Sequence, residues 1–489
     1  MFKQKSMAGF VLAGAAVAAF SLMAPGAALA DDASGVLKRA AAAMGDPKTL
    51  RYTAEGTGWT YGQAFVPGKP WPKINVHNLT RTINYDTASM REEITLSRAE
   101  PKGGGGYPLS GQQRNDQFVS GDMAWNMAGT NAQPGPRFVA DRVHQLWVTP
   151  HGVIKAAMKH NAKLSFASRG GKSLAAVSFT VPGRLKATAY FNDSFVLERV
   201  ESRLPDPVLG EVASVALFSE YRDTGGIKFP GRISMAQGGH PTLEVIVTNV
   251  TPNAPADIQV PDAVAKAVER VTTEKVADGV WHVAGGSHNS VAIEMKDHIV
   301  MVEAPLNDGR SAPVIDEVKK LAPGKPIRFV INSHNHFDHT GGIRTAAALG
   351  ATIVTQAGNK AYFEKALATK NTINPDLLTK SAKKAKVMGV GEKMQMSDGT
   401  RTLEVHRITG GDHNDTFLMV YMPKERLLIE ADAFTPGPPG SKPPATPNGN
   451  HLTLVSNIER LKLDIDKILP LHGRVVPLAE LYTAVGKTR

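Results

Sequence analysis

The sequence predicts an α+β protein of two parts, in which a β-rich antiparallel domain precedes a domain of alternating strands and helices. The chain has 489 residues, and single hydrophobic cores stop growing near ~250–300 residues. Alternating apolar and polar residues dominate the first half, and the pattern changes after Thr251–Pro261, a segment rich in Pro, Ala and Asn. We therefore expect an N-terminal domain at residues 31–261 and a C-terminal domain at residues 271–489.

The first thirty residues have the order of a secretory signal peptide. Lys3 and Lys5 precede an apolar stretch at residues 7–23, and Ala28-Leu29-Ala30 supplies small residues at a cleavage point. The stretch is rich in Ala and Gly and is shorter than the ~20 strongly apolar residues that span a bilayer. We expect cleavage after residue 30, a periplasmic or secreted protein, and no membrane span after the signal is removed.

Composition limits the chemistry and the partners. The chain has no cysteine, so any metal ion must be held by His, Asp or Glu, and Cys-rich structural zinc sites are excluded. The formal net charge is +11, but no compact run of Lys and Arg is present. We expect a small-molecule substrate and no nucleic-acid partner, while the sequence does not specify the oligomeric state.

Half-buried strands separated by Gly-rich turns make up most of the expected N-terminal domain. Strands are expected at residues 75–85, 92–98, 174–181, 186–190, 195–201, 212–221 and 243–250. Turn signals lie at residues 103–106, 170–171, 223–226 and 238–239, and helices are expected at residues 35–44 and 137–159. A structural or lid role is the simpler interpretation of this domain, and dedicated ligand binding is the alternative.

The expected C-terminal domain alternates strands and helices. Strands are expected at residues 280–283, 290–294, 299–302, 329–332, 351–354, 401–408, 416–422 and 427–430. Helices are expected at residues 342–349, 359–368 and 452–463, and a further helix at Ala312–Leu321 is expected to take Ser311 as its N-cap.

Four side chains that can bind metal ions follow the expected strand at residues 329–332. His334, His336, Asp338 and His339 lie within six residues, and Thr340-Gly341-Gly342 follows them. In an extended loop, positions two apart face the same side, so His334 and His336 point together. Imidazole and carboxylate are standard zinc ligands, and the sequence therefore predicts a metal site at this strand end.

This motif, His-x-His-x-Asp-His followed by Thr-Gly-Gly, resembles the signature of the metallo-β-lactamase superfamily. The resemblance covers the chain from about Val271 to its C-terminus and implies an αββα sandwich with three later metal ligands. Candidates follow apolar strands in the expected order: His413 in a Gly-rich loop, Asp432 and His472. His406 is a rival to His413, but it falls within an expected strand.

The resemblance implies two Zn²⁺ ions, although iron or manganese also fit such ligands. The first zinc would be held by His334, His336 and His413, and the second by Asp338, His339 and His472. Asp432 would bridge the two ions. A shared hydroxide would attack a carbonyl carbon, Asp338 would also orient that hydroxide, and Thr340 and Asp412 would support the ligands.

We therefore expect an exported dinuclear zinc hydrolase of esters, lactones, thioesters or amides. Asp432 stands where the best-known β-lactamases have a metal-binding Cys, so β-lactams are a less favoured case. Iron-dependent sulfur oxidation in the same fold and a non-catalytic envelope binding protein are the alternatives. His288 and Asn289 could line the pocket, but a turn is the simpler interpretation of that stretch. His451 could also reach the pocket, and a surface position is an equally simple interpretation for it.

Overall fold

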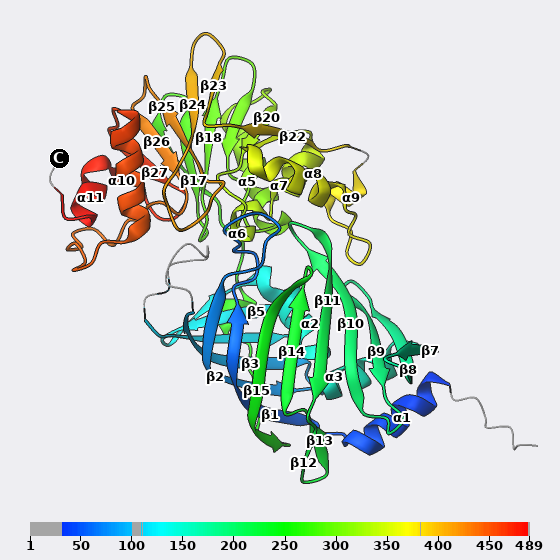
Figure 1. The fold of residues 1–489 in the computed structure, drawn as a ribbon. Coiled ribbons are helices and arrows are strands. Elements are labelled where there is room, and N and C mark those ends of the chain that lie inside the picture. The colour runs from blue at the N-terminus through cyan, green and yellow to red at the C-terminus, as the bar shows by residue number, and fades with distance from the viewer. Residues whose placement is uncertain (1–31, 100–108, 110, 382, 488–489) are drawn as a thin grey trace, which may run out of the picture.

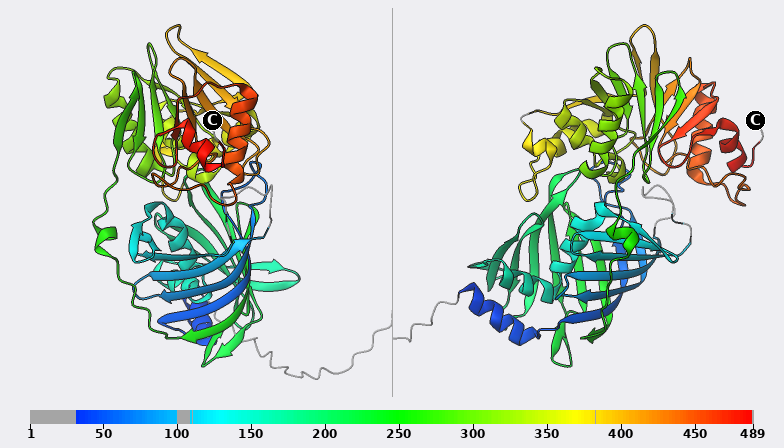
Figure 2. Two further views of the ribbon diagram at one scale, coloured as in Figure 1. Left: turned by 90° about the vertical axis from the view of Figure 1, so that its left-hand side faces the viewer. Right: turned by 180° about the vertical axis from the view of Figure 1, so that it is seen from behind.

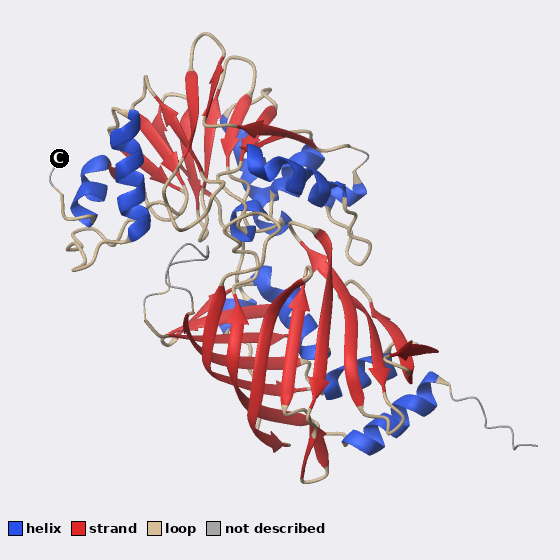
Figure 3. Ribbon diagram, viewed as in Figure 1, coloured by secondary structure: helices blue, strands red, loops and turns tan. Residues whose placement is uncertain are grey.

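A computed structural model describes residues 32–99, 109, 111–381 and 383–487. The chain forms two parts, an antiparallel β-rich part and a layered part of sheets and helices (Figures 1 and 3). This arrangement confirms the α+β class and the β-rich N-terminal region expected from the sequence. The expected signal peptide at residues 1–30 and the expected turn at residues 103–106 lie outside the described residues.

The N-terminal part is built on one antiparallel sheet of thirteen strands in the order β6-β5-β4-β3-β2-β1-β15-β14-β11-β10-β9-β8-β7. These strands are β1 (Thr49–Trp59), β2 (Lys73–Asn84), β3 (Ser89–Arg98), β4 (Gln113–Ser120), β5 (Met123–Ala128), β6 (Asn131–Pro134), β7 (Lys163–Arg169), β8 (Lys172–Val181), β9 (Leu185–Phe191), β10 (Leu197–Asp206), β11 (Gly210–Ser219), β14 (Arg232–Gln237) and β15 (His240–Pro252). A separate hairpin is formed by β12 (Arg222–Thr224) and β13 (Ile227–Phe229). The expected strand at residues 195–201 begins only at Leu197, because Phe195 lies in a turn with a φ of 58°.

The large sheet curls around helices, which fill its concave side (Figures 1 and 2). They are α1 (Ala33–Met44), η1 (Pro136–Phe138), α2 (Val139–Trp147) and α3 (Pro150–Lys159). Helix α1 begins where the Asp32 side chain accepts a hydrogen bond from Gly35 N at 2.7 Å, and its buried face includes Val36, Leu37 and Met44. One hydrophobic core joins the helices to the inner face of the sheet.

Two histidines in this core bear no relation to a metal site. The Nε2 atom of His151 donates to the Met44 carbonyl at 3.2 Å, and the Nε2 atom of His144 lies 2.8 Å from Ser202 Oγ. Burial lowers the pKa of each imidazole to about 4. Both side chains are therefore neutral in the folded protein at neutral pH.

Because His144 and His151 are buried in the neutral form, we expect the folded protein to lose stability in acid. Since the unfolded chain takes up protons near pH 6.5 and the folded chain only near pH 4, stability is greatest above pH 6.5 and falls toward pH 4. Each histidine accounts for a loss on the order of 3 kcal/mol. Denaturant unfolding of a His144→Gln/His151→Gln double variant should show a flatter pH dependence than the parent protein. Equal slopes in both proteins would contradict this assignment.

The C-terminal part contains two facing sheets with helices on their outer sides, the αββα sandwich expected from the sequence (Figures 1 and 3). One sheet contains β16 (Thr272–Ala277), β17 (Val280–Ala284), β18 (Ser290–Glu294), β19 (Ile299–Val302), β20 (Ile327–Ile331), β21 (Thr352–Gln356) and β22 (Lys386–Val390). The other contains β23 (Lys393–Ser397), β24 (Thr402–Arg407), β25 (Leu418–Met422), β26 (Leu427–Glu430), β27 (Lys467–Pro470) and β28 (Val476–Pro477). Apolar side chains between the sheets form one core with α10, and a second core lies between the first sheet and α5 and α7.

The helices of this part are α5 (Asp308–Leu321), α6 (Phe337–Thr340), α7 (Ile343–Leu349), η2 (Ala357–Asn359), α8 (Lys360–Ala368), α9 (Leu377–Lys380), α10 (Gly449–Leu461) and α11 (Leu478–Ala484), and α4 (Asp262–Ala265) lies in the connection between the parts. The four that the sequence predicted, α5, α7, α8 and α10, differ from expectation mainly at their ends, whereas α6, α9 and α11 were not predicted. Ser311 is not the N-cap of α5, because Asn307 caps the helix by accepting from Arg310 N at 3.1 Å. Ser311 is instead buried within α5, where its hydroxyl donates to the Pro305 carbonyl. None of the helices that the structure describes has the length and apolar character needed to cross a bilayer.

A turn of the N-terminal sheet enters the core of the C-terminal part. Val208, at the tip of the β10–β11 hairpin, is fully buried among side chains of the C-terminal core. Gly210, two residues after Val208, has a φ of 77°. A Cβ atom at this position would lie 2.6 Å from the Thr369 carbonyl oxygen. The close approach of the two backbones therefore requires glycine at this position.

Candidate active site

The loop after β20 carries the first predicted ligands into the interior. His334, His336 and His339 are fully buried, and Thr340 Oγ1 donates to the His336 carbonyl at 3.0 Å. A Cβ atom on Gly341 would lie 1.7 Å from the Leu306 carbonyl oxygen, and one on Gly342 would lie 1.9 Å from Ser311 Oγ. The glycine pair therefore permits α6 and its flanking loop to pack directly against the start of α5.

The structure brings all seven predicted ligands together with one further histidine. Their ligand atoms form two groups, and within each group these atoms lie within 4.8 Å of one another. One group is His334, His336, His413 and Asp432; the other is His288, Asp338, His339 and His472. The side chains come from the segments after strands β20, β26 and β27 and from the loops before β18 and β25. Whether each binds a metal ion stays a prediction.

Asp432 is a member of the first group that also contacts the second. Its Oδ2 atom is 2.9 Å from His413 Nε2 and 3.5 Å from His334 Nε2. Its Oδ1 atom is 3.0 Å from His339 Nε2 and 2.8 Å from His472 Nε2. Each oxygen of one carboxylate therefore faces a different group, as a bridging ligand between two ions would require.

The chemistry of this donor set suits metal ions. Burial lowers the pKa of His334 to about 3 and that of His336 well below its ordinary value, so both imidazoles are neutral and can act as ligands. Neither ring nitrogen of His336 has a hydrogen-bond partner among the described residues, although both are buried. Burial of such polar atoms without partners is costly, and a cation held by the group would remove that cost.

Carboxylates from both groups and from Glu303 surround His339 of the second group. Burial opposes ionisation of Asp338 and Asp432, but neighbouring His339 holds the pKa of both carboxyls well below its usual range. Burial would lower the pKa of His339, whereas Asp432, Asp338 and Glu303 around it raise that pKa well above its ordinary value. Three carboxylates surrounding one buried imidazole would be stabilised by a bound cation in the same way.

Hydrogen bonds from outside the groups fix the orientation of several imidazoles. His472 Nδ1 donates to the Ser287 carbonyl at 3.1 Å, so its Nε2 atom keeps a free lone pair. Ser333 Oγ lies 2.8 Å from His334 Nδ1 and holds that ring in place in the first group. The Asn289 side chain donates to the Gly473 carbonyl at 2.8 Å, which holds the loop of His472 in place. Such contacts set which nitrogen faces a metal ion.

His288 belongs to the site, although a turn was the simpler interpretation of the sequence around it. Its Nε2 atom is 3.1 Å from Asp338 Oδ2, its Nδ1 atom is 2.9 Å from Ser287 Oγ, and its ring centroid lies 4.3 Å from that of His472. Burial lowers the pKa of His288 to about 4. The pair Ser287-His288 after Gly285-Gly286 is the local signal that pointed to this position.

Glu303 is a candidate functional residue that the sequence reasoning did not identify. Its side chain is fully buried, Oε1 accepts from Ser333 N at 2.6 Å, and Oε2 lies 3.3 Å from His339 Nδ1. The residue has a φ of 66°, a strained conformation that proteins retain mainly at functional sites. An acidic residue directly after the wholly apolar strand β19 was the available signal.

Other candidates lie outside the two groups. His406 is within β24, where its Nε2 atom is 2.9 Å from Glu404 Oε2, so His413 rather than His406 joins the site. His451 packs edge-on against Phe434 with ring centroids 4.9 Å apart. Among the described residues, Asp412 makes no hydrogen bond to any of the predicted ligands.

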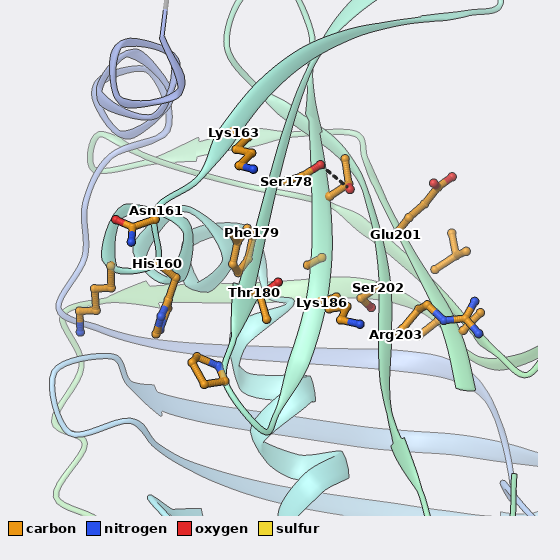
Figure 4. Close-up of a pocket in the computed structure, with 17 residues that line it drawn as sticks. His160, Asn161, Lys163, Ser178, Phe179, Thr180, Lys186, Glu201, Ser202 and Arg203 are labelled. Carbon is orange, nitrogen blue, oxygen red and sulfur yellow. Dashed lines mark hydrogen bonds between the residues drawn. The ribbon is translucent and has the colours of Figure 1, made fainter. Parts of the chain in front are cut away.

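A cavity of about 780 Å³ lies in the N-terminal part, between the end of α3 and strands β8–β11 (Figure 4). Ser202 lines this cavity and contacts His144, but the Nδ1 atom of His144 has no partner among the described residues. The pair therefore lacks the acidic group that orients the histidine of a catalytic triad. None of the predicted metal ligands lines this cavity, so the two groups remain the candidate centre of chemistry.

Residues 283–472 match the family model of the Metallo-beta-lactamase superfamily. The C-terminal part of the chain therefore has the fold of that superfamily and resembles it over these residues. The resemblance supports a metal-dependent enzyme of hydrolase type, and the superfamily also includes other chemistries.

Individual relatives are distant. The chain is 25% identical over 208 residues to the 2,4-dinitroanisole O-demethylase subunit alpha of Nocardioides sp. (strain JS1661), a match that covers 41% of this chain and 57% of that relative. Similar solved structures include the metallo-beta-lactamase from Pontibacter korlensis (17% identity, 44% of this chain and 98% of that one, TM-score 0.34) and that from Hirschia baltica (21% identity, 44% and 96%, TM-score 0.33).

Proposed function

We propose that the protein is an exported hydrolase that uses two zinc ions to cleave an ester, lactone, thioester or amide. The observation that carries the proposal is the convergence of two four-residue groups of His and Asp on one bridging carboxylate, Asp432. When bound, two zinc ions generate a nucleophile from water near neutral pH and polarise the carbonyl that it attacks. Export rests on the order of residues at the N-terminus alone.

The residues of this chain would have distinct tasks in that reaction. His334, His336 and His413 would hold one ion, Asp338, His339 and His472 the other, and Asp432 would join them. The Oδ2 atom of Asp338 faces His288. This carboxylate is therefore placed to accept a hydrogen bond in the site as well as to bind metal. Neutral His334 and His336 carry no negative charge that would offset the charge of the ion they would hold, so they would preserve its Lewis acidity.

A screen of the purified, zinc-loaded protein tests the proposal. The substrates should be chromogenic esters, lactones, thioesters and β-lactams, together with a nitroaryl methyl ether because of the relative named above. We expect turnover of at least one carbonyl substrate, loss of that turnover with dipicolinate, and recovery with added zinc.

An oxygen electrode run alongside the screen separates the alternatives. Hydrolysis consumes no oxygen, whereas oxidation of a sulfur compound does. Turnover that survives complete removal of metal, or oxygen consumption matched to product, would reject the proposed hydrolase. Binding of a small molecule without any turnover would support the non-catalytic alternative instead.

A further inference from the structure

The β1–β2 loop, residues 60–72, belongs to the N-terminal sheet but reaches the predicted metal site of the C-terminal part. The Gln63 side-chain amide donates to Asp338 Oδ1 at 2.8 Å. Since an ionised carboxylate can only accept hydrogen bonds, the amide nitrogen must be the atom that faces it. The second oxygen of Asp338 is contacted by His288, so each oxygen of this carboxylate has its own partner.

The backbone of the same loop joins two segments that carry predicted ligands. The Ala64 carbonyl accepts from Asn335 Nδ2 at 3.0 Å and from Asn414 Nδ2 at 3.2 Å. Asn335 neighbours both His334 and His336, and Asn414 follows His413 in the chain. The two asparagines also bond to each other at 2.7 Å. A single carbonyl of the N-terminal part therefore ties together the loops that supply three of the four members of the first group.

The loop is fixed at both of its sides. Phe337 N donates to the Gly62 carbonyl at 3.0 Å, and Asp415 N donates to the Phe65 carbonyl at 3.0 Å. The Phe337 ring packs edge-on against Tyr61 and Trp71 with centroids 5.3 and 5.6 Å apart. A Cβ atom on Gly62 would lie 2.7 Å from the Phe337 ring, so the contact leaves no room for a larger residue.

A second contact between the parts supports the position of this loop. Tyr61 OH donates to Asp206 Oδ2 at 2.8 Å, and Asp206 precedes the β10–β11 turn whose tip, Val208, is buried in the C-terminal core. The Oδ1 atom of Asp206 accepts from Val208 N and Leu209 N at 2.9 and 2.7 Å. Two anchors thus hold the β1–β2 loop against the site, and the contact of Gln63 with Asp338 is part of a wider docked surface.

We propose that Gln63 is a positioning residue for Asp338, so that the N-terminal part completes the active site instead of only covering it. The inference rests on the proposed function in that Asp338 is taken as a ligand of the second metal ion. With Gln63 on Oδ1, the carboxylate cannot rotate freely and keeps Oδ2 toward the second group. Partners of this kind around a metal ligand typically change metal affinity or activity by about 10–100-fold when removed.

Gln63→Met tests the proposal because Met has nearly the same length and flexibility but donates no hydrogen bond. We expect about 10–100-fold weaker binding of the second zinc in competition with a chelator and a similar fall in kcat, with KM changed by less than about threefold. The visible spectrum of the cobalt-substituted protein should change as well. Gln63→Glu, which places a like charge against Asp338, should weaken binding of the second ion further or alter its pH dependence. Gln259→Ala, an exposed glutamine in the connection between the parts, serves as the control.

Each outcome decides the proposal. Metal affinity, cobalt spectrum and kcat of Gln63→Met equal to those of the parent would overturn it, and so would a change in KM alone, since that would place Gln63 against substrate instead. If Gln63→Met folds poorly, Gln63→Glu carries the same measurements. Chelator competition and the cobalt spectrum need no substrate, so a parent protein that binds two ions but hydrolyses nothing would reject the proposed function and still test Gln63.

Discussion

His334→Ala is expected to lose one of two bound zinc ions and nearly all turnover. The side chain belongs to the first group only, and its Nε2 atom faces Asp432 Oδ2 and His413 Nε2. Removing an outer contact of a metal ligand costs about 10–100-fold in affinity or activity, and loss of the ligand itself should exceed that range. The measurements are zinc content by mass spectrometry and kcat/KM on the substrate found in the screen.

Thermal unfolding measures metal binding by the same variant without the need for a substrate. A ligand that binds only the folded state stabilises it by about 2.7 kcal/mol at one hundred times its dissociation constant. Added zinc should therefore raise the Tm of the parent more than that of His334→Ala. His77→Ala, which removes an exposed histidine on β2, should match the parent in all three measurements. Two zinc ions retained by His334→Ala, with full activity, would show that the first group is not a metal site.

The sequence predicted those residues of the site that lie close together in the chain. His334, His336, Asp338 and His339 follow one buried strand, and their spacing indicates a shared site before any long-range contact is known. His413 was separable from His406 because a histidine within a strand alternates with its neighbours, whereas one in a Gly-rich loop is free to turn toward the site. Local pattern was therefore sufficient wherever one segment carried several ligands.

Long-range partners were not predictable in the same way. Gln63 lies 275 positions from Asp338, in a loop whose own residues give no sign of a metal site. Its role arises only because the N-terminal sheet docks on the C-terminal part. The strand β4 was missed for a related reason: its residues, Gln113–Ser120, are mostly polar and half-buried, and pairing with β3 and β5 overrides their weak preference for strand.

Helix starts were the least certain local feature. Ser311 and Asn307 are both good N-cap residues, and choosing between them requires knowing that Ser311 already donates to a buried carbonyl. The large-scale fold needed no such detail, because the alternation of strands and helices after residue 271 and the half-buried strands before residue 252 determine the layers. Tertiary contacts decided the ends of the elements and the outer contacts of the site.

Glu303→Gln is expected to weaken metal binding far more than folding. The amide oxygen can replace Oε1 as acceptor for Ser333 N, so the backbone contact at 2.6 Å is kept. The amide nitrogen then faces His339 Nδ1, where the carboxylate oxygen lay at 3.3 Å. A donor at that position favours the imidazole form that carries its proton on Nε2, the atom that faces Asp432 Oδ1 and that a metal ion would need deprotonated.

We therefore expect zinc affinity of Glu303→Gln to fall by about 10–100-fold, with denaturant unfolding of the metal-free protein close to that of the parent. Glu303→Ala removes both contacts, and the buried Ser333 N–H left without an acceptor should cost about 1–3 kcal/mol in addition. Glu55→Gln, on the exposed side of β1, is the matched control for loss of a charge. Comparison of the Gln and Ala variants decides the role of Glu303. Equal losses of stability in the two variants, with zinc affinity intact in Glu303→Gln, would show that Glu303 only supports the Ser333 backbone. The orientation of His339 would then be set by its other neighbours.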